Sequence, residues 1–182
     1  MKNISQLEKG FTYIEAILYV AILSVMLSAL IPFTWSIIEG GTQSATQQEV
    51  SSNARFISER IKYEIRNATG INTGGGNTDC AIASKVISLI NSTGSLNPTV
   101  ITYDAPNTRV TIKQGTTGPL ATPMPLNSSD VKITSFSCSN NTSGSLTKNI
   151  SFSFQVNQAY TGTRADFKST MTVQSSAEVR SN

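Results

Sequence analysis

The stretch Gly10-Phe11-Thr12-Tyr13-Ile14-Glu15 opens an apolar run that continues to about Ile38. No charged residue lies between Ala16 and Ile38, so Glu15 is the one charge inside the run. An acidic side chain at the centre of a membrane-spanning helix costs about 2.5 to 3.5 kcal/mol. Glu15 lies about 6 Å of helix rise past Phe11, nearer the membrane interface than the centre. An ionisable residue at that depth indicates a function and requires a partner.

The length of the run favours a membrane anchor over a signal peptide. The run is long enough to cross a bilayer of ~30 Å, whereas a secretory signal has a shorter apolar core and a small-residue cleavage site. Lys2 and Lys9 favour a cytoplasmic N-terminus, and the rest of the chain then lies outside the cytoplasm. An ordinary signal-anchor and an uncleaved signal peptide are alternatives, but neither explains Gly10-Phe11 together with Glu15.

The N-terminal segment resembles the type IV pilin and type II secretion pseudopilin superfamily. The resemblance consists of a short basic leader ending in Gly10, then Phe11, then Glu15 as the fifth residue after that glycine, with Pro32 further along the helix. It implies that a prepilin peptidase cuts between Gly10 and Phe11 and N-methylates Phe11. It also implies that Glu15 pairs with the Phe11 amine of a neighbouring subunit during assembly. Pro32 is expected to kink or locally loosen the helix, because proline removes a backbone donor.

The helix is expected to run from about Thr12 to about Thr69, with Gly40-Gly41 as a hinge and Gly70 as its stop. Its second half has apolar residues at spacings of three and four, which predicts an amphipathic helix packed on the protein's own sheet. These apolar residues are Val50, Ala54, Ile57, Ile61, Ile65 and Ala68. The residues expected on the opposite face, as a solvated surface or a subunit contact, are Arg55, Glu59, Arg60, Lys62, Glu64 and Arg66, with Arg60 and Glu64 spaced for an ion pair.

The remaining chain reads as short strands separated by turns, which predicts an antiparallel sheet covered on one face by the helix. The expected strands are 85–90, 100–103, 109–113, 131–138, 150–156 and 166–174. Residues 105–108 and 140–145 are expected to be turns, residues 73–77 a flexible loop, and residues 115–129 a long connection containing prolines.

These elements predict an α+β fold of the type IV pilin-like kind, in which a long N-terminal helix packs on a C-terminal antiparallel sheet. The predicted organisation has four parts. They are a leader at 1–10, a transmembrane or filament-core helix at 11–38, an amphipathic helix at 39–70, and an extracytoplasmic β-rich head at 71–182.

The composition argues against an enzyme. The chain has 182 residues, a formal net charge of +3 and no histidine, so Ser and Cys nucleophiles lack the commonest general base. No metal site is expected, because the aspartates lack the spacing of a calcium loop and two cysteines without histidine make a poor zinc site. No cofactor is expected either. Nucleic-acid binding is not supported, since the positive charge is small and basic residues do not alternate with aromatics.

The two cysteines, Cys80 and Cys138, favour one disulfide if the head is extracytoplasmic. Closing so long a loop stabilises the fold by about 4 kcal/mol in the chain-entropy model. Two buried free thiols are the alternative.

The resemblance implies a minor pilin or pseudopilin, most similar to J-type minor pseudopilins and related minor pilins, in a pilus or secretion pseudopilus. Residues 60–68 resemble the helix that enters such heads, and residues 125–136 and 171–182 loosely resemble their late strands. The implied partners are the prepilin peptidase, other pilins or pseudopilins, an inner-membrane assembly platform and the lipid bilayer. The implied location is the bacterial inner membrane, crossed once, with the head outside. A major pilin and a membrane-anchored adhesin or DNA-uptake receptor are alternatives.

Overall fold

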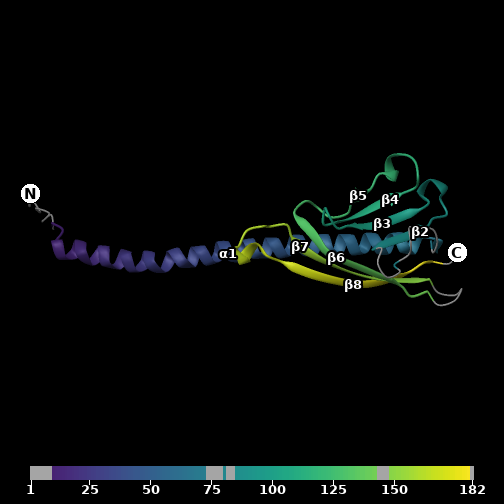
Figure 1. Cartoon of the computed structure of the whole chain (residues 1–182). Coiled ribbons are helices and arrows are strands. Elements are labelled where there is room, and N and C mark those ends of the chain that lie inside the picture. Colours follow the sequence, from purple (N-terminus) through teal and green to yellow (C-terminus); the bar gives the residue numbers. More distant parts are fainter. Residues whose placement is uncertain (1–9, 73–79, 81–84, 143–147, 181–182) are drawn as a thin grey trace, which may run out of the picture. The chain divides into compact units, whose positions relative to one another are not determined.

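The structure is a computed structural model that describes residues 10–72, 80, 85–142 and 148–180. The chain divides into two compact units, Met1–Gly41 and Thr42–Asn182, here called the N-terminal unit and the head unit. The helix α1, Tyr13–Asn67, begins in the first unit and ends in the second (Figure 1). The expectation of a single long N-terminal helix is confirmed, and the helix ends slightly earlier than the predicted Thr69.

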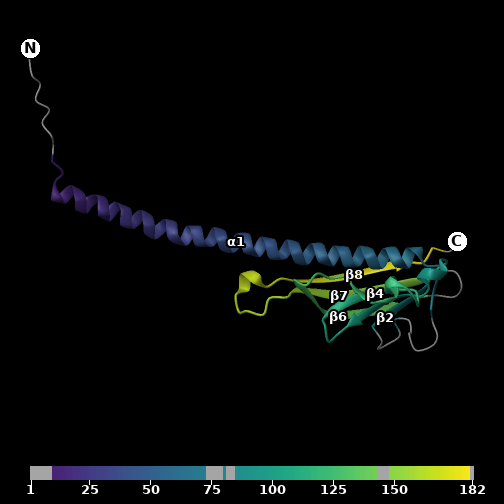
Figure 2. The same ribbon diagram turned by 90° about the horizontal axis from the view of Figure 1, so that it is seen from above.

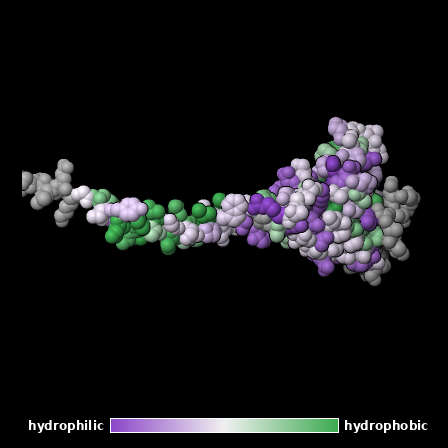
Figure 3. Space-filling view, turned by 60° about the vertical axis from the view of Figure 1, so that its left-hand side comes forward, coloured by the Kyte–Doolittle hydropathy of each residue, from purple (hydrophilic) through white to green (hydrophobic). Residues whose placement is uncertain are grey.

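The described part of the N-terminal unit, residues 10–41, is mostly an exposed apolar helix. Among the described residues, α1 is the helix long and apolar enough to cross a membrane by length and composition. Figure 3 shows apolar side chains gathered along this unit, whereas the visible surface of the head is mostly polar. The hydroxyls of Ser24, Ser28 and Thr34 donate to the helix's own carbonyls at 2.8, 2.8 and 2.9 Å. Internal pairing of this kind is what a hydrocarbon surrounding requires of a polar group.

The helix continues through Pro32 and through Gly40-Gly41, so neither position ends it. Pro32 has no N–H and therefore cannot donate to the Ser28 carbonyl one turn earlier. The kink at Pro32 stays a prediction. The boundary between the two units follows Gly41 directly.

The head unit contains two antiparallel sheets in its described part. The first has the order β1 (Gly70–Ile71), β2 (Val86–Ile90), β3 (Thr99–Asp104), β4 (Arg109–Gln114) and β5 (Met124–Pro125). The second has the order β6 (Val131–Asn140), β7 (Asn149–Gln158) and β8 (Thr170–Glu178). Three single-turn 3₁₀ helices lie between strands: η1 (Gly94–Leu96), η2 (Pro119–Ala121) and η3 (Ala165–Phe167). Figure 2 shows the second half of α1 running along these sheets.

The helix stripe and the sheets form one core. The predicted stripe is confirmed, because all its members are buried: Val50, Ala54, Ile57, Ile61, Ile65 and Ala68. In β7 every second side chain is buried, and these side chains are Ile150, Phe152, Phe154 and Val156. The stripe and the alternating strand residues belong to the same buried cluster. The head therefore encloses its own hydrophobic core between helix and sheets.

Several predicted boundaries in the head are wrong. The strands form two sheets, not one. Gly70 is not a helix stop but pairs with Ile90 as the first residue of β1. The last strand begins at Thr170 because residues 165–167 form η3, and the predicted connection at 115–129 contains β5. The turn at 105–108 is confirmed as the link between β3 and β4. The loop at 73–77 and the end of the turn at 140–145 lie outside the described residues.

Glu64 is also not on a solvated face, contrary to the prediction. Its side chain is 3% exposed, because it follows Ile57 and Ile61 at seven and three residues and so lies beside the buried stripe. Arg60 forms the predicted ion pair with it at 2.7 Å, and the Gln114 side-chain amide donates to its other oxygen at 3.1 Å. Burial raises the pKa of the Glu64 carboxyl, and the Arg60 charge and the Gln114 hydrogen bond oppose that rise.

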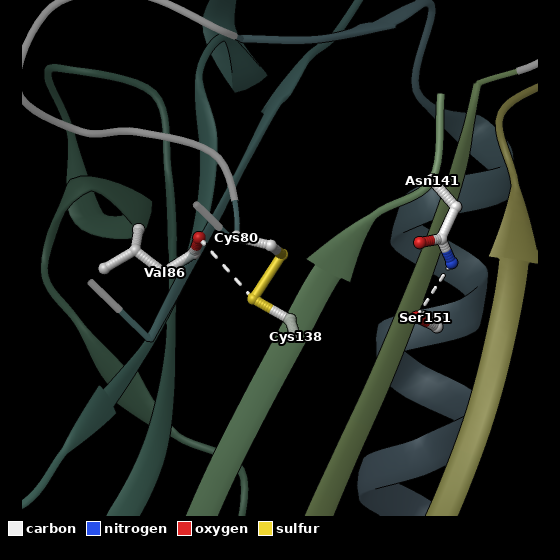
Figure 4. Close-up of a disulfide and its surroundings, with 5 residues drawn as sticks. All are labelled: Cys80, Val86, Cys138, Asn141 and Ser151. Carbon is white, nitrogen blue, oxygen red and sulfur yellow. Dashed lines mark hydrogen bonds between the residues drawn. A yellow bond between two sulfur atoms is a disulfide. The ribbon is translucent and has the colours of Figure 1, made fainter. Parts of the chain in front are cut away.

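A disulfide joins Cys80 and Cys138, with 4.9 Å between the Cα atoms (Figure 4). Cys138 belongs to β6, whereas Cys80 lies between β1 and β2, so the bond connects the segment between those strands to the second sheet. The Cys138 Sγ atom also lies 3.9 Å from the Val86 carbonyl oxygen. A disulfide sulfur has no proton to donate, so this approach is a packing contact.

Candidate functional site

The candidate site lies at the start of α1, where Thr12 precedes the first helical residue, Tyr13. The Thr12 hydroxyl accepts from the Glu15 N–H at 3.4 Å, and the Thr12 carbonyl accepts from the Ala16 N–H at 3.2 Å. Thr12 thus occupies the N-cap position and Glu15 the third helical position, which is the sequence spacing of a capping box. The local sequence therefore starts the helix at the residues that also carry the cleavage motif.

The Glu15 carboxylate is exposed and lies beside two aromatic rings. The Tyr19 hydroxyl donates to Glu15 Oε1 at 3.4 Å, one helical turn further on. The Phe11 ring packs against the Tyr19 ring, with 5.6 Å between their centroids. Phe11 is itself 72% exposed. Phe11, Glu15 and Tyr19 thus form one cluster on the helix surface, with its carboxylate open to another molecule.

The electrostatics of the cluster favour a negative charge. The first turn of a helix presents unpaired N–H groups and the positive end of the helix dipole, which stabilises a carboxylate by about 0.3 to 1 kcal/mol. The cluster holds no cation among the described residues of this chain's first helical turns. A positively charged amine from another molecule could therefore pair with the Glu15 carboxylate and contact the Phe11 and Tyr19 rings beside it.

The structure brings three of the predicted site residues together and leaves the others apart. Gly10, Phe11 and Glu15 are within two turns of one helix start. Pro32 follows Glu15 by about 25 Å of helix rise. Cys80 and Cys138 belong to the head. Tyr19 is a member of the cluster that the cleavage motif does not include, and its signal is the four-residue spacing from Glu15.

Compared with models of known protein families, with curated proteins and with solved structures, the chain gives no match. The resemblance to pilins therefore rests on the sequence motifs alone, chiefly those of the N-terminal segment.

Proposed function

We propose that this chain is a minor pilin or pseudopilin. In this proposal a prepilin peptidase removes residues 1–10 and methylates Phe11, and the subunit is held in the bacterial inner membrane by residues 11–38. An assembly platform then moves it into a pilus or a secretion pseudopilus, at the start or tip of the filament. The work of the protein is mechanical and does not involve catalysis.

The observation that carries the proposal is the position of Glu15. It is the one charge within the apolar run, it follows Gly10-Phe11 at a fixed spacing, and its carboxylate is exposed beside the Phe11 ring. Cleavage after Gly10 would create a cationic amine at Phe11. That amine on a neighbouring subunit supplies the partner that an acidic residue in an apolar surrounding requires. Processing and assembly would then depend on each other chemically.

A second observation supports packing between subunits. The outer face of the head-unit helix keeps two large aromatic residues in solvent, since Phe56 and Tyr63 are each 58% exposed. They are seven residues apart, so they lie on one face of the helix. Arg60 reaches over the Tyr63 ring, with 5.7 Å between its guanidinium carbon and the ring centroid. A face of this kind is suited to contact with another helix.

The test is the intact mass and the N-terminal peptide of the protein taken from membranes, with and without a prepilin peptidase. We expect a peptide that begins at N-methylated Phe11 only when the peptidase is present. An intact Met1 terminus under both conditions would instead indicate a plain signal-anchor. A cut beyond Phe11 would indicate a secreted β domain, and both results would contradict the proposal.

Abundance separates the minor subunit from its alternatives. A minor subunit is expected at trace level in sheared filaments, whereas a major pilin would form their bulk. Specific binding of the head to DNA or to a surface ligand, without incorporation into filaments, would favour the membrane-anchored receptor.

A further inference from the structure

The connection between β7 and β8, residues 159–169, combines two aromatic rings with basic side chains. The Tyr160 and Phe167 rings are 5.0 Å apart between centroids, and the Arg164 guanidinium lies over the Phe167 ring at 5.2 Å. Tyr160 remains 39% exposed, and Arg164 and Lys168 are exposed. The pair of rings therefore presents an amphipathic surface.

A glycine leaves room for this arrangement. A Cβ atom at Gly162 would lie 2.0 Å from the Tyr160 hydroxyl oxygen, closer than any real contact allows. Gly162 therefore permits the Tyr160 ring to lie across the connection. The Tyr160 ring therefore lies over Gly162 and beside the Phe167 ring.

The connection lies at the end of the head unit where the chain enters it. Lys148, beside the first residue of β7, donates to the Thr69 carbonyl at the far end of α1. The ten residues of β7 span about 33 Å, which equals about 22 helical residues counted back from Asn67. Counting 22 residues back from Asn67 reaches Ala45, three residues after Thr42. The Ala159 N–H donates to the Asp130 carbonyl, and the Ser128 N–H donates to the Asn53 side chain of α1. The start of the connection therefore lies beside a part of α1 that is nearer to Thr42 than to Asn67.

The pictures agree with this placement. Figures 1 and 2 both show the connection, in yellow, at the end of the second sheet opposite the labelled C-terminus. In the sequence, Thr42 follows Ile38, the last residue of the apolar run, by four positions. If the run spans a bilayer, the entry end of the head is therefore the end tied closest to the membrane surface.

We propose that the β7–β8 connection rests on the lipid headgroups while the subunit is stored in the membrane. This inference depends on the membrane-stored stage of the proposed function. Tyrosine is favoured at a membrane interface because it has an apolar ring and a polar end, and Arg and Lys side chains extend from apolar surroundings to the headgroups. Asp130 lies at the same end of the head as Arg164 and Lys168, and its negative charge offsets part of their positive charge. The contact should therefore depend on the rings more than on anionic lipid.

Tryptophan quenching in vesicles tests the proposal on the full chain. The chain has one tryptophan, Trp35, inside the apolar run, and its quenching by lipids brominated deep in the acyl chain reports the span. With Trp35→Phe as background, Tyr160→Trp probes the connection, and Tyr63→Trp is the matched control. Tyr63 is exposed and lies about 31 Å of helix rise beyond Thr42. The vesicles are phosphatidylcholine, with and without phosphatidylglycerol, and carry bromine near the headgroup.

We expect loss and a blue shift of fluorescence for Tyr160→Trp in both kinds of vesicle, and no change for Tyr63→Trp. Quenching of Trp35 without quenching of Tyr160→Trp would overturn the proposal and leave the membrane span intact. Failure to quench Trp35 would overturn the span and this proposal together. A spin label attached through Thr163→Cys repeats the test without altering the rings, and Thr142→Cys, beyond the far end of the second sheet, is its control. We expect the label at position 163 to become less mobile when vesicles are added and the label at position 142 to be unchanged. Equal mobility changes at the two positions would contradict the proposal.

Discussion

Glu15 stabilises the start of its own helix, and this local role must be separated from a role in assembly. The third helical position suits a carboxylate in any exposed helix, because the positive end of the helix dipole favours a negative charge there. Glutamine keeps the size and shape of the side chain and one acceptor oxygen, and it removes the charge. Glu15→Gln therefore tests the charge alone.

We expect Glu15→Gln to be cleaved normally and to enter filaments at least about tenfold less than the wild type, since a charge left unpaired in a dry interface costs well over 1.4 kcal/mol. Comparing processed protein in membranes with protein in sheared filaments measures this ratio. Glu39→Gln is the matched control, because Glu39 lies at the other end of the apolar run and accepts from Trp35 at 2.7 Å. Equal incorporation of the two variants would contradict the pairing of Glu15 with an amine.

Glu64 should make the head less stable as the pH rises. Its pKa is raised above the usual 4.5 by burial, so the folded protein holds this proton to a higher pH than the unfolded chain does. Stability therefore falls between pH 4.5 and the folded pKa and is level above it. Glu64→Gln should abolish this fall and stay within about 1 kcal/mol of the wild type at neutral pH, since a neutral isostere replaces a buried ionic group.

Urea unfolding followed by circular dichroism across the acidic range measures the effect. Glu59 provides the control, because it is exposed and its pKa is lowered, chiefly by a hydrogen bond from Lys62. Its contribution is present above pH 4.5 and disappears as the pH falls, the opposite sign to that of Glu64. The difference in stability between the wild type and Glu64→Gln isolates the contribution of Glu64. A pH dependence that Glu64→Gln leaves unchanged would show that Glu64 is not the group responsible.

At the scale of elements, the helix stripe is expected to contribute most to the stability of the head. Ile61→Ala should destabilise the head by about 2 to 5 kcal/mol, because Ile61 is fully buried and the substitution leaves a cavity. Phe56→Ala, on the exposed face of the same helix, should change the free energy of unfolding by no more than about 0.5 kcal/mol. Denaturant midpoints of the two variants measure the difference. Similar losses for both would show that the stripe does not form the core.

The elements with a regular hydrophobic period were predictable from sequence. The three- and four-residue spacing of the stripe and the alternation in β7 both place side chains on one face, and burial follows. Strands too short to show a hydrophobic period were not predictable. β1 and β5 have two residues each, and both exist only because a neighbouring strand offers an edge. Glu64 was predicted on the solvated face because it is charged, although its position three residues after Ile61 places it beside the buried stripe.

At the scale of the whole molecule, the division of the strands between two sheets was not predictable, because the end of one sheet and the start of the next have no local signature in the sequence. Consecutive strands pair within each sheet, but nothing in the sequence marks the break between β5 and β6. The cluster at the helix start was more accessible to prediction. Its residues lie within two helical turns, so their sequence spacing is also their spacing in space.

The disulfide is expected to contribute about 4 kcal/mol to the stability of the head, because it closes a loop with a sequence separation of 58 residues. Cys80→Ser with Cys138→Ser should lower the free energy of unfolding by about that amount. Reductant should destabilise the wild type to the same extent and leave the double variant unchanged. A stability that reductant does not alter would show that the bond contributes nothing to the head.

The same bond limits how far the head lengthens under tension. In the proposed filament a subunit would be pulled through its helix, and a chain that unfolds under tension extends by about 3.5 Å for each residue released. The bond between Cys80 and Cys138 withholds the intervening stretch of 58 positions, which is about 200 Å of extended chain. In the proposed filament, a subunit whose sheets are pulled apart would therefore extend by about that length less than a subunit without the bond.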